Sequence, residues 1–312
     1  LSFCPSSRAP LLCISGYTFA QASIAPAPQI LLGTARPRRL TRLPCGPHDH
    51  PMTKTTNGPA AVIAADCPWA PRDTNDNGGR GASHKYQVMT TDEIAAMALP
   101  DRDERHVLFL WRLASMQVDA LQVLDAWGYV PCAEVVWQKL RACQTCAATG
   151  RVEVWTFAGE LVLVPGADRI CPDCNGLRGT PHLGLGHYAR AAHEVAIIAR
   201  PKRGSAPERL AKDVPSIFAA PMLIDVDGVL PASEGRRGAL VHSAKPDEFF
   251  ELVERLYPGP RVEMFSRRTR PGWSSTHSDQ AGTLDEVARV FREDWPRRVR
   301  EERLAKARRA AR

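Results

Sequence analysis

Short apolar runs recur along residues 60–266, and the amphipathic segments between them limit the folds open to the chain. The runs predict buried strands and the amphipathic segments predict helices. The expected strands are Ala60–Ala65, His106–Trp111, Ala133–Gln138, Glu194–Ala199 and Arg261–Ser266. The expected helices are Thr91–Leu99 with Thr91 as its N-cap, Met116–Trp127 and Pro246–Tyr257. Alternating strands and helices indicate an α/β fold with a doubly wound, mainly parallel, Rossmann-like sheet.

The two ends of the chain differ in character from its centre. Residues 1–51 are rich in Pro, Ser, Ala and Arg without a sustained period, so we expect a disordered leader or an upstream extension before Met52. A transit peptide is the alternative for this segment. The main domain is expected at residues 52–280, with an insertion at 140–183 and a basic helix at 281–312.

Charge is concentrated at these ends. The formal net charge is +7, to which residues 1–51 and 281–312 each contribute +4, so the centre carries −1. The charge therefore gives no evidence that the central domain binds nucleic acid. Because the chain contains no apolar run of about 18 residues, we expect no membrane partner and a cytoplasmic protein.

Four of the nine cysteines form two C-x-x-C pairs with 24 residues between them. Two such pairs suit a tetrahedral structural zinc, and a zinc site would fold a small module that lacks a sizeable core. We therefore predict a zinc-knuckle module with the ligands Cys143, Cys146, Cys171 and Cys174. Four unligated or redox-active cysteines are the alternative.

The tetrapeptide Asp66-Cys67-Pro68-Trp69 directly follows the first expected strand. An amine on an aromatic ring is a weak nucleophile because its lone pair is delocalised, so it needs acceptors that hold its protons. The Asp66 carboxylate and a backbone carbonyl fixed by the following proline can accept them, while Trp69 can stack on a base. No G-x-G-x-x-G motif is present, which disfavours a dinucleotide cofactor.

Further blocks follow this tetrapeptide in a fixed order. They are Tyr86, Leu108–Trp111, Trp127–Tyr129, Val136–Lys139, Gly184–Tyr188, His193-Glu194, His242–Pro246, Glu263–Arg267 and Pro271–Trp273. The ordered series resembles the MT-A70-like adenine methyltransferase family, whose signature D-P-P-W precedes the same blocks. The resemblance covers residues 60–279.

The resemblance implies a Rossmann-like methyltransferase fold, and an enzyme that moves a methyl group from S-adenosylmethionine to the exocyclic amine of adenine in nucleic acid. Asp66, Cys67, Pro68 and Trp69 would be catalytic, and Asp66 would also meet the cofactor. Lys245 would contact the methionine carboxylate. Its position suits this role, because the N-terminus of the helix that follows also favours anions. Glu263, Phe265 and Arg267 would bind the adenosine part.

The sequence departs from the family pattern in two places. Cys67 stands where the family has its first proline, so the turn loses a rigid ring. His277-Ser278-Asp279 stands where the family has a Gly-Asn pair that meets the cofactor ribose. We expect Ser278 or Asp279 to take over the ribose contact, since both accept hydrogen bonds.

Several interpretations stay open from the sequence. DNA is favoured over RNA as the polymer because no RNA-binding module is evident. The cytosine amine is the alternative target, and an inactive zinc-containing nucleic-acid-binding protein is the alternative function. The insertion either engages nucleic acid or is a structural brace. The loop at 73–85 either closes over the base or is an ordinary surface loop.

Overall fold

The computed structural model describes residues 58–70, 88–184, 188–230, 237–241, 244–278 and 280–312. The chain divides into two units, residues 1–48 and 49–312, and every described residue belongs to the second. The predictions for the leader, for the loop at 73–85, and for Tyr86, His187 and Asp279 lie outside the described residues. No described helix is long and apolar enough to cross a bilayer.

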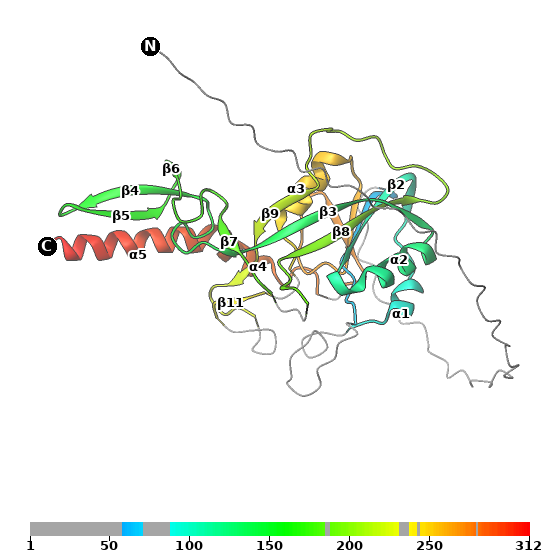
Figure 1. Cartoon of the computed structure of the whole chain (residues 1–312), viewed down its shortest axis with the longest axis horizontal. Coiled ribbons are helices and arrows are strands. Elements are labelled where there is room, and N and C mark those ends of the chain that lie inside the picture. The colour runs from blue at the N-terminus through cyan, green and yellow to red at the C-terminus, as the bar shows by residue number, and fades with distance from the viewer. Residues whose placement is uncertain (1–57, 71–87, 185–187, 231–236, 242–243, 279) are drawn as a thin grey trace, which may run out of the picture. The chain divides into compact units, whose positions relative to one another are not determined.

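A single mixed sheet forms the centre of the second unit (Figure 1). Its strands are β1 (Ala60–Ala65), β2 (Arg102–Arg112), β3 (Tyr129–Ala142), β7 (Gly179–Pro181), β8 (His193–Pro201), β9 (Ile217–Pro221), β12 (Arg261–Met264) and β13 (Trp273–Thr276). Their order is β13-β12-β1-β2-β8-β3-β7, with β9 also paired to β3. The pairs β13·β12, β12·β1, β1·β2 and β3·β9 are parallel.

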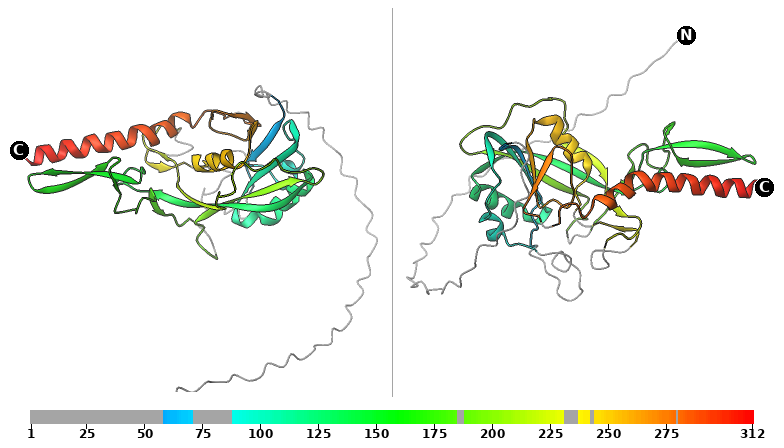
Figure 2. Two further views of the ribbon diagram at one scale, coloured as in Figure 1. Left: turned by 90° about the horizontal axis from the view of Figure 1, so that it is seen from above. Right: turned by 180° about the vertical axis from the view of Figure 1, so that it is seen from behind.

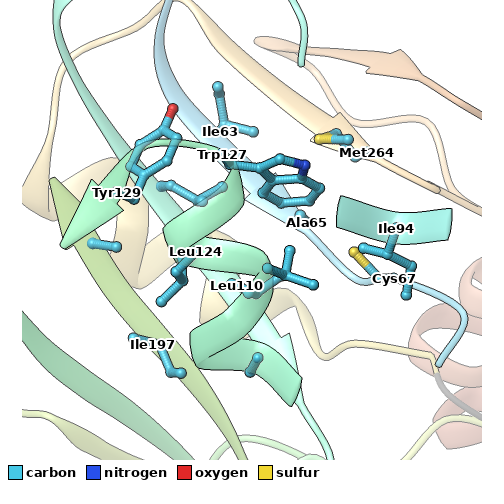
Figure 3. Packing of buried hydrophobic residues seen from close by; sticks show 14 of the residues in the cluster. Ile63, Ala65, Cys67, Ile94, Leu110, Leu124, Trp127, Tyr129, Ile197 and Met264 are labelled. Carbon is cyan, nitrogen blue, oxygen red and sulfur yellow. The ribbon is translucent and has the colours of Figure 1, made fainter. Parts of the chain in front are cut away.

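Helices cover both faces of this sheet, as its strand pattern predicts. α1 (Thr91–Ala95) and α2 (Gln117–Ala126) pack on one face, and α3 (Asp247–Leu256) packs on the other. The remaining helices, α4 (Asp285–Arg289) and α5 (Trp295–Ala310), follow towards the C-terminus. Every residue of β1 is buried, but successive side chains point to opposite faces. Ile63 and Ala65 pack with α1 and α2 (Figure 3), whereas Val62 and Ala64 pack with α3. The expected doubly wound α/β arrangement is therefore present.

Two antiparallel strands add to the mainly parallel sheet that the sequence predicts. β8 runs antiparallel to both β2 and β3, and β7 runs antiparallel to β3. Parallel neighbours need a crossover, usually a helix, but no described residue between β3 and β8 is helical. The six strands β1, β2, β3, β9, β12 and β13 nevertheless run in one direction, so the sheet is mainly parallel with β8 and β7 as its antiparallel strands.

Helix α1 is also shorter than predicted. Its N-cap is Thr90 rather than Thr91, and Thr90 forms a capping box with Glu93. The Glu93 N–H donates to Thr90 Oγ1 at 3.2 Å and the Thr90 N–H donates to Glu93 Oε2 at 2.8 Å. Pro100 disfavours a helical backbone at Leu99, and the helix ends at Ala95.

The insertion forms a small sheet of its own, in the order β5-β4-β6. Its strands are β4 (Arg151–Phe157), β5 (Glu160–Pro165) and β6 (Arg169–Ile170). A further antiparallel pair joins β10 (Ile224–Asp225) to β11 (Ala239–Leu240). The C-terminal helix α5 lies along β5, as both further views show (Figure 2).

Candidate active site and metal centre

The candidate active site lies where the strand order reverses. The chain leaves β1 towards β2, β8 and β3, and later returns to the other side of β1 with β12 and β13. Ligands of open α/β sheets bind outside the carboxyl ends of strands at such a switch point. Asp66 follows β1 directly and therefore stands at this position.

Lys245 meets Asp66 at this edge of the sheet. Its Nζ donates to Asp66 Oδ2 at 2.6 Å, and the Lys245 side chain is 6% exposed against 23% for Asp66. Burial raises the pKa of Asp66 above its ordinary value, although the Lys245 charge opposes the shift. Burial alone would lower the pKa of Lys245, but the Asp66 and Glu194 carboxylates raise it, so the ammonium stays charged.

Two residues that sequence reasoning missed complete this cluster. Lys245 Nζ lies 3.3 Å from Glu194 Oε2, and Lys139 Nζ is ion-paired with Glu194 Oε1. Burial raises the pKa of Glu194, yet Lys245 and Lys139 hold it below its ordinary value. Both residues lie in blocks already noted, and their charge at the edge of a buried strand was a usable signal.

The aromatic ring of Trp111 lies against the ammonium group of Lys245. Lys245 Nζ lies 5.2 Å from the centre of the Trp111 ring, within the range of a cation–π contact. Lys139 Nζ lies 5.4 Å from the Trp137 ring in the same way. Carboxylates and ammonium groups thus alternate in the order Asp66, Lys245, Glu194 and Lys139. Each of the two lysines also contacts a tryptophan ring.

The turn after Asp66 is compact. The Trp69 N–H donates to the Cys67 carbonyl at 2.9 Å, and the Met89 N–H donates to the Pro68 carbonyl at 2.7 Å. A carbonyl oxygen accepts up to two hydrogen bonds, so the Cys67 oxygen keeps one acceptor position beyond the turn. The Cys67 carbonyl, which precedes Pro68, can therefore still accept a further hydrogen bond, although Cys67 stands where the family has its first proline.

Trp69 is more deeply packed than a stacking platform requires. It is 4% exposed, and its indole N–H donates to the Trp111 carbonyl at 2.9 Å. The ring lines a pocket of about 30 Å³ together with Asp66, Cys67, Trp111, Arg112, Leu113, Glu194 and Lys245. This volume holds about two water molecules, which gives room for an amino group.

Glu263 occupies the end of β12, next to β1. It is 8% exposed and accepts a hydrogen bond from Ser266 Oγ at 2.9 Å. Burial raises its pKa to about 7. Arg270 Nε lies 3.6 Å from Glu263 Oε2, so Arg270 is the arginine beside this carboxyl, while Arg267 is half-buried nearby.

Phe265 adopts an unusual backbone conformation directly after β12. Its φ is +65°, and its N–H donates to the Thr276 carbonyl at 3.0 Å. A bulky residue in the left-handed region is strained, and such strain gathers at ligand sites. The Phe265 ring lies 6.0 Å from that of His277, whose φ is +54°.

Ser278 is engaged within its own loop. Its hydroxyl donates to the Ser266 carbonyl, and it accepts from the Gln280 N–H at 3.1 Å. The expected ribose contact of Ser278 therefore competes with two existing hydrogen bonds. That contact and the one expected of Asp279 stay predictions.

The four cysteines of the two C-x-x-C pairs meet in one buried cluster. Their Sγ atoms all lie within 4.8 Å of one another. The Sγ atoms of Cys143 and Cys171 are 3.9 Å apart, and those of Cys146 and Cys174 are 3.7 Å apart. A tetrahedral zinc with Zn–S distances of about 2.3 Å places its sulfurs about 3.8 Å apart, so the spacing fits.

Backbone geometry around the cluster also suits a metal. The Gly150 N–H donates to Cys146 Sγ at 3.3 Å, a contact that favours a thiolate. Burial raises the pKa of the Cys171 thiol, and a bound cation would offset that cost. Among the described residues, this is the one group of three or more ligating side chains close enough to hold a metal ion.

An acid, a buried lysine and an acceptor carbonyl thus meet at the switch point of an α/β sheet, where such sheets bind their ligands. The family model of MT-A70 matches residues 60–164 and 235–278, which include Asp66, Lys245 and Glu263. The chain belongs to the MT-A70-like family.

Named relatives agree with this assignment. The N(6)-adenosine-methyltransferase catalytic subunit METTL3 of Homo sapiens is 26% identical over 77% of this chain and 32% of its own length. The N(6)-adenosine-methyltransferase MT-A70-like protein of Drosophila melanogaster is 26% identical over 71% of this chain and 27% of its own length. The chain thus spans about a third or less of these relatives.

Proposed function

We propose that this chain transfers a methyl group from S-adenosylmethionine to the exocyclic amine of adenine in nucleic acid. The observation that carries the proposal is the Asp66–Lys245 pair at the switch point, within the stretch that the MT-A70 model matches. The relatives are named as N(6)-adenosine methyltransferases, which supports the same target atom.

Asp66 and the Cys67 carbonyl act on the target amine. The pocket beside them has room for an amino group, so the amine would enter while the base stays at the mouth. Two acceptors would hold its two protons and turn its lone pair outward, and one proton would leave to Asp66, whose pKa is already raised by burial. Lys245 and Glu194 would keep Asp66 in one orientation.

The site fits S-adenosylmethionine on the evidence of its own groups. When bound, this cofactor supplies a methyl group on a sulfonium cation. Glu263 is a buried carboxyl whose pKa of about 7 shows that its surroundings do not fully stabilise its charge, so it suits donor groups of a ligand. Lys245 would meet the methionine carboxylate, and Phe265 and Arg267 the adenosine part.

The test has a binding step and a product step. The full chain is titrated with S-adenosylmethionine in a calorimeter and then incubated with matched DNA and RNA oligonucleotides. Nucleoside mass spectrometry of the digest should show N6-methyladenine for the wild type and for the exposed control Asp101→Asn, but not for Asp66→Asn. N4-methylcytosine would replace this proposal by the cytosine alternative, and binding of nucleic acid without cofactor affinity would favour an inactive binding protein.

The same digests show whether the chain methylates DNA or RNA. The preference for DNA is a prediction from the sequence, whereas the relatives' names refer to adenosine. Product in one polymer and not in the other would settle the choice.

We further propose that Cys143, Cys146, Cys171 and Cys174 hold a structural zinc. The sulfur spacing supports four ligands around one ion, and the module has a core of little more than these cysteines and Val152. Metal analysis of the purified chain should give one zinc per chain, and Cys171→Ser should lose it. A chain that is folded and free of metal after purification in zinc-containing buffer would contradict this assignment.

A further inference from the structure

One arginine links the cysteine module to the helix that follows Lys245. Arg178 lies between the second C-x-x-C pair and β7, and its guanidinium is ion-paired with Glu248. Glu248 belongs to the first turn of α3, three positions after Lys245. Arg178, Lys245 and Glu248 line one pocket of about 130 Å³.

The module fixes the position of Arg178 at both its backbone and its side chain. The Arg178 carbonyl accepts a hydrogen bond from the Cys143 N–H at 3.0 Å. Its Nε donates to the Ala148 carbonyl at 2.9 Å. Arg178 also has a φ of +69°, a left-handed conformation that a side-chain-bearing residue holds only when its surroundings impose it. The first knuckle, residues 143–148, therefore fixes the position and direction of the Arg178 guanidinium.

The first turn of α3 is held by arginines from three directions. Asp247 is ion-paired with Arg268 and Arg270, which follow β12, and with Arg292, which precedes α5. Glu248 adds Arg178 from the cysteine module. The short segment from Lys245 to α3 thus depends on these ion pairs for its position, and Lys245 is the buried cation of the candidate site.

We propose that Arg178 is a positioning residue through which the metal-bound cysteine module sets the affinity of the Lys245 site for S-adenosylmethionine. The inference rests on the proposed function, because it assumes that Lys245 meets this cofactor. It assigns the insertion the role of a brace for the cofactor site. A rigid module would hold Glu248, and hence Lys245, in the binding position before the cofactor arrives, which reduces the ordering that binding requires.

The experiment measures cofactor affinity rather than turnover. The full-length wild type, Arg178→Met, Glu248→Gln and the double variant are titrated with S-adenosylmethionine by calorimetry. Arg169→Met is the matched control, because it removes an exposed arginine of the same module. Zinc content and the thermal midpoint are measured for every protein.

Each single variant should raise Kd about fivefold or more, and the double variant should raise it no further, because both remove the same coupling. Zinc content should stay at the wild-type level, and the control should bind like the wild type. Kd values within twofold of the wild type for both single variants would overturn the coupling while leaving the proposed function intact. If Arg178→Met does not fold, Glu248→Gln alone decides. A wild type that fails to bind S-adenosylmethionine would overturn the proposed function and this inference with it.

Discussion

Lys245 Nζ lies 2.6 Å from Asp66 Oδ2, although the two residues are 179 positions apart in the chain. The pair joins the end of the first strand to the start of α3, and its lysine side chain is only 6% exposed. Its energetic role differs from that of a surface pair, because removing one partner leaves a largely buried charge without compensation.

Replacing Lys245 by methionine should therefore destabilise the protein strongly. The substitution leaves Asp66 and Glu194 with one compensating cation fewer, and we expect a loss of about 3–5 kcal/mol in the free energy of unfolding. Urea unfolding measures this loss. The control Lys202→Met breaks the exposed pair with Asp125 and should cost less than about 1 kcal/mol. Equal losses in the two variants would contradict the role given to burial.

Asp66→Asn should slow methyl transfer about 100-fold or more, because an amide is a weaker proton acceptor than a carboxylate. The measurement is a single-turnover reaction at saturating S-adenosylmethionine, so that any loss of cofactor affinity cancels. The exposed Asp101→Asn should react at the wild-type rate. A near-wild-type rate for Asp66→Asn would remove Asp66 from the chemistry.

Glu263 should make the stability depend on pH between about 4.5 and 7. Its pKa in the folded protein is raised to about 7 by burial, so the folded state binds more protons than the unfolded state in this window. Stability should consequently fall as the pH rises through it, by an amount on the order of 3 kcal/mol. Glu263→Gln should remove this fall, whereas Glu160→Gln on the exposed start of β5 should keep it. Unfolding curves at pH 5 and pH 8 provide the comparison.

The C-terminal helix should depend on the metal. The Arg303 guanidinium donates to the carbonyls of Gln144, Thr145 and Leu163 at 2.9, 2.7 and 3.0 Å. Helix α5 is therefore hydrogen-bonded directly to the first knuckle and to β5. Chelation of the metal and Arg303→Met should both speed amide hydrogen exchange in α5. Arg309→Met, at the exposed end of the helix, is the control. Unchanged protection of α5 after chelation would show that the helix docks independently of the metal.

Local pattern was enough to predict the part of the site that follows β1. An apolar run ending in an acid placed Asp66 at a strand end, and the structure confirms the strand with the same bounds. Lys245 was assigned from the family resemblance, and the structure brings it onto Asp66. The first prediction depended on a few adjacent residues, and the second on the order of short motifs along residues 60–279.

The remaining contacts depend on strand pairing, which no local pattern encodes. Glu194 reaches Lys139 because β8 pairs antiparallel with β3, with Glu194 opposite Trp137. The sequence analysis expected a mainly parallel sheet and did not identify β8 as an antiparallel strand, so it did not predict this ion pair. The strands of the insertion were missed for a related reason, since their apolar residues pack on cysteines and on α5 rather than on the main core.

Strand β3 runs without a break from the main sheet to Ala142, whose partner on β7 is Gly179. The whole cysteine module therefore leaves and re-enters the sheet through two neighbouring positions. In evolutionary terms this is a graft point: a two-residue turn could close the gap and leave every strand register of the main sheet unchanged. A chain of this kind can gain or lose an entire accessory module there in one step, and with it the Arg178–Glu248 ion pair, while the strands that carry Asp66 and Glu194 keep their register.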